Sequence, residues 1–179
     1  MAKHSKASAA PMAIRTRRAY FDCQFGQLHV RTAFPSSGGF DEQVTLFCLH
    51  PSEGSSRAFD RLLPAMAHDR SVYAPDLPGF GESDPAPSLD SAEAARAVSD
   101  LATDLRLRRI DVLGVGFGAA VALELAAARP DLVRRLVLAA SSMNRKPAVA
   151  QETLVLEGAD ELLGASPAAP AIHIRAFLR

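Results

Sequence analysis

The pattern of apolar and polar residues changes character near residue 44. Before it, Arg18–Cys23 and Leu28–Phe34 alternate between apolar and polar positions on either side of a Gly-containing turn. This alternation predicts an antiparallel hairpin at the edge of a sheet. Val44–Leu49 is almost uniformly apolar, as in a central parallel strand that is covered on both faces. The chain is therefore expected to begin with an antiparallel hairpin and to continue into a parallel sheet.

Beyond residue 49, strand-like and helix-like segments alternate. Strands are expected at 71–74, 110–114, 133–139 and 153–158, and helices at 55–67, 91–105 and 117–128. This succession predicts an α/β fold with right-handed crossovers and a mostly parallel sheet. In such folds the functional residues gather at the carboxyl ends of the strands. Residues 18–179 form one predicted domain, and the basic residues 1–17 are expected to be a disordered tail or, alternatively, a transit peptide.

Composition narrows the range of partners. The 179 residues include 20 Lys and Arg against 20 Asp and Glu, without a basic stripe, which argues against nucleic acid or an anionic membrane surface as the main partner. The most apolar stretch, Ala119–Ala128, is interrupted by Glu124 and is too short to span a bilayer. Cys23 and Cys48 are too few for a disulfide framework, and no Cys or His lies near them at the spacing of a zinc site. We expect a cytoplasmic protein with reduced thiols and no metal or cofactor.

Three strand ends carry distinctive residues. Asp76–Asp84 reads DLPGFGESD, His50 opens the loop HPSEGSS, and Gly114–Gly118 reads GVGFG between a strand and a helix. In this order and spacing, from about Arg18 to Ala140, the motifs resemble the α/β-hydrolase family. The resemblance implies an α/β-hydrolase fold with an N-terminal antiparallel hairpin. It also implies hydrolysis of a small ester or a related acyl substrate.

The strand-to-helix turn, or nucleophile elbow, departs from the family. The family pattern is G-x-nucleophile-x-G, usually with Ser in the middle, whereas the middle residue here is Gly116, which has no side chain to attack a substrate. The resemblance places two oxyanion donors at the N–H groups of Phe117 and Ser52. Pro51 stands where the family often has Gly, and His50 is expected to fix the loop geometry rather than to act as an acid or a base.

The acid and the base of a catalytic triad should follow the elbow. The segment 153–161, TLVLEGADE, resembles the family strand that precedes the acidic residue, and it offers Asp160 or Glu161, or two solvated loop carboxylates. Spacing favours Glu161 and residue type favours Asp160. His173, the only histidine beyond the elbow, lies in AIHIRAFL, where alternation predicts a strand, and is the candidate base. Two other histidines are expected at the surface of a strand and of a helix end, His29 and His68.

This chain lacks two segments of the family pattern, a lid domain and a C-terminal segment. Only residues 141–152 join two predicted strands, so there is no room for a lid domain and the pocket is expected to be open. The chain stops at Arg179, where the family would continue into a histidine loop and a closing helix. Either the chain is a naturally truncated pseudoenzyme, or its final segment, residues 164–179, is not the sequence around which the fold was built. Without the closing helix, an apolar strand and face are expected to be uncovered and the stability to be marginal. A relocated nucleophile would be one of three serines: Ser52, Ser141 or Ser142.

Two other functions fit parts of the pattern. A non-catalytic member would bind a small ligand or a partner through the open pocket. The spacing Gly114-x-Gly116-x-x-Ala119 also matches a dinucleotide fingerprint, with Arg145 and Lys146 available for an NADP 2′-phosphate. Against this, such a fingerprint should open the first strand–helix–strand unit, and two units precede it here.

Overall fold

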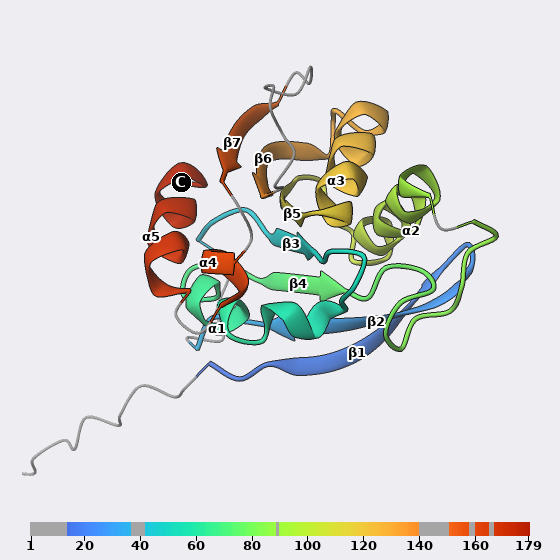
Figure 1. Cartoon of the computed structure of the whole chain (residues 1–179), viewed down its shortest axis with the longest axis horizontal. Helices are drawn as coiled ribbons and strands as arrows, with labels where there is room; N and C mark the ends of the chain where they lie inside the picture. Colours follow the sequence, from blue (N-terminus) through green and yellow to red (C-terminus); the bar gives the residue numbers. More distant parts are fainter. Residues whose placement is uncertain (1–13, 37–41, 89, 140–150, 158–159, 165–166) are drawn as a thin grey trace, which may run out of the picture.

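A seven-stranded sheet forms the centre of the protein, in the strand order β1-β2-β4-β3-β5-β6-β7 (Figure 1). The computed structural model describes residues 14–36, 42–88, 90–139, 151–157, 160–164 and 167–179. The strands are β1 (Arg17–Cys23), β2 (Gly26–Ala33), β3 (Leu46–Leu49), β4 (Val72–Pro75), β5 (Ile110–Val115), β6 (Val133–Ala139) and β7 (Glu152–Leu156). The helices are η1 (Ser56–Phe59), α1 (Leu62–Met66), α2 (Ser91–Asp104), α3 (Phe117–Ala128), α4 (Asp160–Leu163) and α5 (Ala168–Phe177).

The sheet is antiparallel at one side and parallel through the rest. β1 and β2 form a hairpin, and β2 also pairs antiparallel with β4. All other neighbours, β4 with β3, β3 with β5, β5 with β6 and β6 with β7, pair in parallel. These pairings confirm the predicted α/β class with its N-terminal antiparallel hairpin. Of the predicted tail, residues 1–13 lie outside the described residues, and Arg17 already belongs to β1.

Two apolar layers bury the central strand. Phe47 and Leu49 of β3 belong to a core cluster shared with α2 and α3, whereas Leu46 and Cys48 belong to a second cluster shared with α1 and α5. The apolar run is uninterrupted because successive side chains of a strand point to opposite faces, and both faces here are covered. All four residues are fully buried.

The helices on the first face form where the sequence predicts them. α2 begins after Asp90, whose Oδ1 accepts a hydrogen bond from the N–H of Glu93 at 2.7 Å, as expected of a helix N-cap. Its buried side, which includes Val98 and Leu101, packs on the core beside α3. α3 spans the predicted residues 117–128.

The predicted helix over 55–67 is interrupted in the structure. It divides into the 3₁₀ helix η1 and the short helix α1. Pro64 accounts for the interruption, because proline has no N–H to donate to the carbonyl four residues earlier. Pro64 lies in the first turn of α1, where this donor is not needed.

The strand predicted from the alternation in AIHIRAFL is wrong, because these residues belong to α5. Ala171, Ile174 and Leu178 are buried in the second core cluster, at the spacing of one helix face, while Ile172 is 66% exposed. α5 lies beside α1 and covers the apolar face that was expected to be uncovered (Figure 1).

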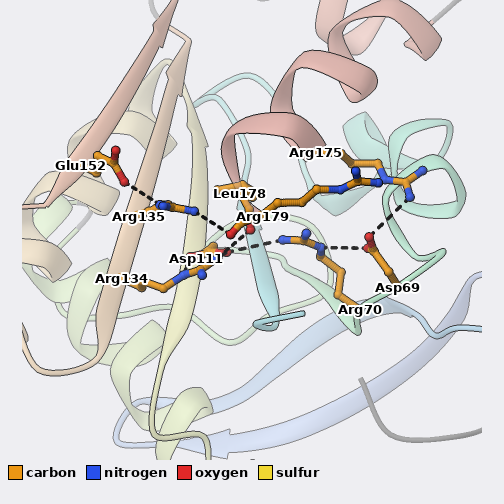
Figure 2. A network of polar contacts seen from close by, with 9 residues as sticks. All are labelled: Asp69, Arg70, Asp111, Arg134, Arg135, Glu152, Arg175, Leu178 and Arg179. Carbon is orange, nitrogen blue, oxygen red and sulfur yellow. Dashed lines mark hydrogen bonds and ion pairs between the residues drawn. The ribbon is translucent and has the colours of Figure 1, made fainter. Parts of the chain in front are cut away.

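A network of charged residues attaches α5 to the amino ends of the parallel strands (Figure 2). Asp111 of β5 is fully buried; it accepts hydrogen bonds from Arg134 at 2.9 and 2.7 Å and from the buried Arg70 at 3.4 Å. Arg134 also donates to the carbonyl oxygen of Leu178 at 2.7 Å.

The next residue, Arg135, pairs with Glu152 at 2.7 Å and donates to the carbonyl oxygen of Arg179 at 3.1 Å. Asp69 completes the network through Arg70 at 3.2 Å and Arg175 at 3.4 Å.

Candidate functional site

The carboxyl ends of β3, β4 and β5 meet at one edge of the sheet (Figure 1). His50 follows β3, Asp76 follows β4 and Gly116 follows β5. β4 lies on one side of β3 and β5 on the other, so the winding of the chain reverses at this point. Ligands of open α/β sheets bind at such reversals, outside the carboxyl ends of the strands.

The turn between β5 and α3, Gly114–Gly118, is called the elbow below and has an unusual backbone conformation. Gly116 has φ 54° and ψ −116°, a conformation that non-glycine residues rarely adopt. Its N–H donates to the carbonyl oxygen of Ala139 at 2.9 Å. Two residues later, the N–H of Gly118 donates to the carbonyl oxygen of His50 at 3.1 Å. The elbow is therefore joined to the ends of both neighbouring strands, β3 and β6.

The three glycines of the elbow serve different purposes. A Cβ atom at Gly114 would overlap the carbonyl oxygen of Gly118, and one at Gly118 would overlap the carbonyl oxygen of Leu49. Both glycines are thus required by close backbone contacts. A Cβ atom at Gly116 would instead lie 3.2 Å from the Cβ of Pro51, and the residue is exposed. The main chain leaves the middle position open, although its φ is unfavourable for a side chain.

Two main-chain N–H groups, one in the elbow and one in the loop after β3, are without an acceptor among the described residues. Phe117 is the first residue of α3, so its N–H has no acceptor within the helix. Ser52 is exposed in the loop after β3, directly after Pro51, and its N–H has no acceptor among the described residues. A helix N-terminus also carries a partial positive charge. Such a helix N-terminus is favourable for an oxygen atom with negative charge.

His50 joins the loop after β3 to the loop after β4. The side chain is fully buried, its Nδ1–H donates to the carbonyl oxygen of Pro51 at 2.8 Å, and its Nε2 accepts from the N–H of Leu77 at 2.9 Å. Burial lowers the pKa of His50, and the hydrogen bond to Pro51 only partly opposes this effect. Both ring nitrogens are therefore engaged in hydrogen bonds that join the two loops.

Asp76 organises the loop that follows β4. Its Oδ1 accepts from the N–H of Ser56 at 2.6 Å, and its Oδ2 accepts from the N–H of Glu82 at 2.9 Å. His29 Nδ1 lies 2.9 Å from the same Oδ2. Burial raises the pKa of Asp76, but the hydrogen bonds from Ser56 and Glu82 outweigh burial, and the pKa lies below its usual value. Gly81 passes so close to this carboxylate that a Cβ atom would overlap Oδ2.

The prediction that His29 lies at the surface is wrong. Its side chain is 1% exposed, with Nδ1 2.9 Å from Asp76 Oδ2 and the ring centroid 5.3 Å from that of Tyr20. His68 is exposed, as predicted. The DLPGFGESD motif marked this loop in the sequence, but the pattern alone did not identify Asp76 as its anchor. An acidic residue directly after a strand and before two glycines is the signal that could have found it.

The candidate acids and the candidate base lie in helices. Asp160 and Glu161 begin α4, rather than lying in a loop. His173 is exposed on α5, and no contact among the described residues joins it to the elbow. Residues 140–150 lie outside the described residues, and with them the predicted lid-free connection, Ser141, Ser142, Arg145 and Lys146.

The described part of the chain offers no metal site, since none of its groups of His, Cys, Asp and Glu could hold an ion. Within the same residues, no helix has the length and apolar character needed to cross a membrane. The two thiols, Cys23 and Cys48, are free. Burial raises the pKa of Cys48, which keeps this thiol protonated.

Comparisons with known proteins agree with this geometry. A family model described as alpha/beta hydrolase fold matches residues 44–177. The pimeloyl-[acyl-carrier protein] methyl ester esterase of Neisseria meningitidis serogroup C is 35% identical over 141 residues, which are 78% of this chain and 53% of that protein. The 2-hydroxymuconate semialdehyde hydrolase of a Pseudomonas species is 36% identical over 109 residues, 59% of this chain and 36% of that protein.

A similar solved structure is a predicted CIB-like hydrolase from Thermoplasma acidophilum. It has a TM-score of 0.68 at 20% identity, over 79% of this chain and 73% of that one, and it supports the fold alone. The chain spans about half the length of the meningococcal esterase that it matches.

Proposed function

Because this chain belongs to the α/β-hydrolase family, we propose that it binds a small ester or a related acyl compound at the elbow without hydrolysing it at an enzyme's rate. One observation carries the proposal. Gly116 keeps the elbow conformation, with φ 54°, but supplies no nucleophile. The elbow is thereby reduced from a reactive group to a binding turn.

The proposed binding of the ligand's oxygen atom depends on two main-chain N–H groups, those of Phe117 and Ser52. The carbonyl or carboxylate oxygen of the ligand accepts hydrogen bonds from the N–H of Phe117 and from the N–H of Ser52. Two relatives, named as a methyl ester esterase and a semialdehyde hydrolase, support a carbonyl compound as the ligand. His50 acts as a positioning residue, because it holds the loop that carries Ser52.

Chemical labelling tests the missing nucleophile. We expect no adduct between the protein and a fluorophosphonate probe, because such a probe requires an activated hydroxyl group. Intact-mass spectrometry measures the adduct, with an active serine hydrolase as the positive control. Stoichiometric labelling would refute the proposal, and the labelled residue would identify a relocated nucleophile such as Ser52.

Two substitutions at one position test the proposed binding. Phe117→Pro removes the N–H at the first helical position, where proline is tolerated, whereas Phe117→Ala removes the ring and keeps the N–H. Calorimetry with butyrate and with methyl butyrate measures affinity. We expect Phe117→Pro to bind butyrate about tenfold more weakly than Phe117→Ala does, the loss typical of one hydrogen bond to a charged group, and to lose less affinity for the uncharged methyl butyrate. Equal affinity of the two variants would show that the N–H is not used.

Restoring the hydroxyl tests whether only the nucleophile is missing. In the p-nitrophenyl acetate assay, we expect Gly116→Ser to remain far below an ordinary esterase, because a serine without a base is weak. An oxyanion site alone supports about 10³ to 10⁴ over water, so faint hydrolysis is allowed in both forms. A gain of several orders of magnitude that disappears on adding His173→Ala would instead establish His173 as the base.

A further inference from the structure

We propose that Pro51 crowds the position where a nucleophile's side chain would begin, so that Pro51 adds to the energetic cost of any side chain at position 116. The inference rests on the proposed role of the elbow as a site without a nucleophile. It concerns a pair of residues on two separate segments: Pro51 in the loop after β3, and Gly116 at the end of β5.

The contacts of the three elbow glycines lead to this pair. At Gly114 and Gly118, main-chain atoms exclude a Cβ, so any side chain there is blocked by the fold itself. At Gly116, the nearest atoms are the Cβ of Pro51 at 3.2 Å and its Cα at 3.6 Å. The first distance is tighter than ordinary van der Waals contact, and the second is ordinary. Apart from the unfavourable φ, the obstacle at this position is therefore one side-chain carbon of Pro51.

Pro51 is poorly able to move aside. Its carbonyl oxygen accepts from His50 Nδ1 at 2.8 Å and from the N–H of Gly54 at 3.1 Å, and the pyrrolidine ring fixes its φ. The preceding carbonyl, of His50, holds the N–H of Gly118 on the elbow itself. The loop is thus anchored on both sides of the proline ring.

A side chain at position 116 and the loop after β3 would therefore compete for the same space. A serine at position 116 would place its Cβ 3.2 Å from the Cβ of Pro51, so one of the two residues would have to shift slightly. The same loop carries Ser52, the second proposed donor, in the next position. If Pro51 is the residue that shifts, restoring the nucleophile would also move the donor that the nucleophile needs.

The position of the contact atom makes the test specific. Alanine at position 51 keeps a Cβ at the point of contact, whereas glycine removes it. The variant Gly116→Ala is made in three backgrounds: the natural Pro51, Pro51→Ala and Pro51→Gly. Urea unfolding of all six proteins gives the unfolding equilibrium constant of each.

We expect Gly116→Ala to raise the unfolding constant by about tenfold more in the Pro51 and Pro51→Ala backgrounds than in the Pro51→Gly background, a coupling typical of contacting residues. The effect of glycine on the unfolded chain cancels, because it is present in both proteins of the Pro51→Gly pair. The strain from the positive φ at position 116 cancels as well, since it accompanies Gly116→Ala in every background.

Equal effects of Gly116→Ala in all three backgrounds would overturn the inference. If Gly116→Ala fails to fold with Pro51, recovery of folding by Pro51→Gly supports the contact, and failure in that background too overturns it. These outcomes are independent of the proposed function, whose own failure appears as fluorophosphonate labelling or as absent binding in the natural chain.

Discussion

Polar residues make different contacts at the two ends of the parallel strands, called here the amino edge and the carboxyl edge of the sheet. At the amino edge, charged side chains mostly bind one another, as Asp111 does with Arg134 and Arg70. At the carboxyl edge, Asp76 also pairs with His29, but His50 and Asp76 mainly accept hydrogen bonds from main-chain N–H groups. The first arrangement joins secondary-structure elements, and the second fixes the shape of connections. The comparison indicates that one edge sustains the fold while the other determines the geometry of the site.

The energetic consequences differ accordingly. Removing one partner of a buried ion pair leaves a charge without compensation, which costs about 3–5 kcal/mol. Removing one hydrogen-bond partner of a neutral buried group costs about 1–3 kcal/mol. Substitutions at the amino edge should therefore reduce global stability the most, and substitutions at the carboxyl edge should act more on ligand binding.

The largest effect is expected from Asp111→Ala. It leaves the buried Arg70 without its strand partner, and we expect a loss of about 3–5 kcal/mol in the free energy of unfolding, measured by urea titration. The control is Asp131→Ala, which breaks the exposed pair with Arg129 and should cost about 0–1 kcal/mol. Similar losses for the two variants would remove the distinction between the buried edge and the surface.

The attachment of α5 is tested by two isoleucines of the same helix. Ile174 is fully buried, and Ile174→Ala should destabilise the protein by about 3 kcal/mol. Ile172 is 66% exposed, so Ile172→Ala should change stability by less than about 0.5 kcal/mol. Thermal and urea unfolding of both variants measure the difference. An equal effect would contradict the helix and favour an alternating strand.

At the carboxyl edge, Asp76→Asn should cost about 2 kcal/mol at pH 7, because hydrogen bonds to a charged acceptor are lost. The lowered pKa of Asp76 gives this cost a pH dependence. The stabilisation by the carboxylate is complete above the usual aspartate pKa, about 3.9, and disappears as the pH falls through the lower pKa of the folded state. Unfolding curves of both proteins at a series of pH values should therefore converge in acid. A constant difference would show that the charge is not involved.

The smallest effect is expected from His50→Gln, about 1 kcal/mol at pH 7, because glutamine can still accept the hydrogen bond from Leu77 but does not reproduce the one to Pro51. The pKa of His50 is lowered in the folded state. Below about pH 6.5 the unfolded chain therefore binds a proton at His50, whereas the folded protein does so only at lower pH. The free energy of unfolding consequently decreases as the pH falls. His50→Gln should flatten this slope between pH 7 and 5, whereas His68→Gln, at an exposed position, should leave it unchanged.

The fold was largely predictable, because its signals are local. The apolar run of β3, the glycines of the elbow and the span of α3 all depend on residues that are close in the sequence. α5 was missed because AIHIRAFL fits both an alternating strand and a helix whose buried face carries Ala171, Ile174 and Leu178. Only packing against α1 and the sheet distinguishes these two arrangements.

The polar interior was less predictable, because its partners are distant in the sequence. His29 pairs with Asp76, which follows β4, and Arg70 pairs with Asp111 of β5. A charge pattern alone treats such residues as solvated. The candidate site could be located from its motifs, whereas the contact between Pro51 and Gly116 required coordinates.

The strand order also has a consequence for folding during synthesis. β3 pairs with β4 and β5, and both lie later in the chain. As a nascent chain leaves the ribosome, Leu46–Leu49 therefore emerges before either neighbour exists to pair with it. Exposed apolar strands of this kind are aggregation-prone and delay folding until non-local contacts form. A ribosome-bound chain ending before Ile110 should thus recruit chaperones at β3, and release them once β5 has emerged.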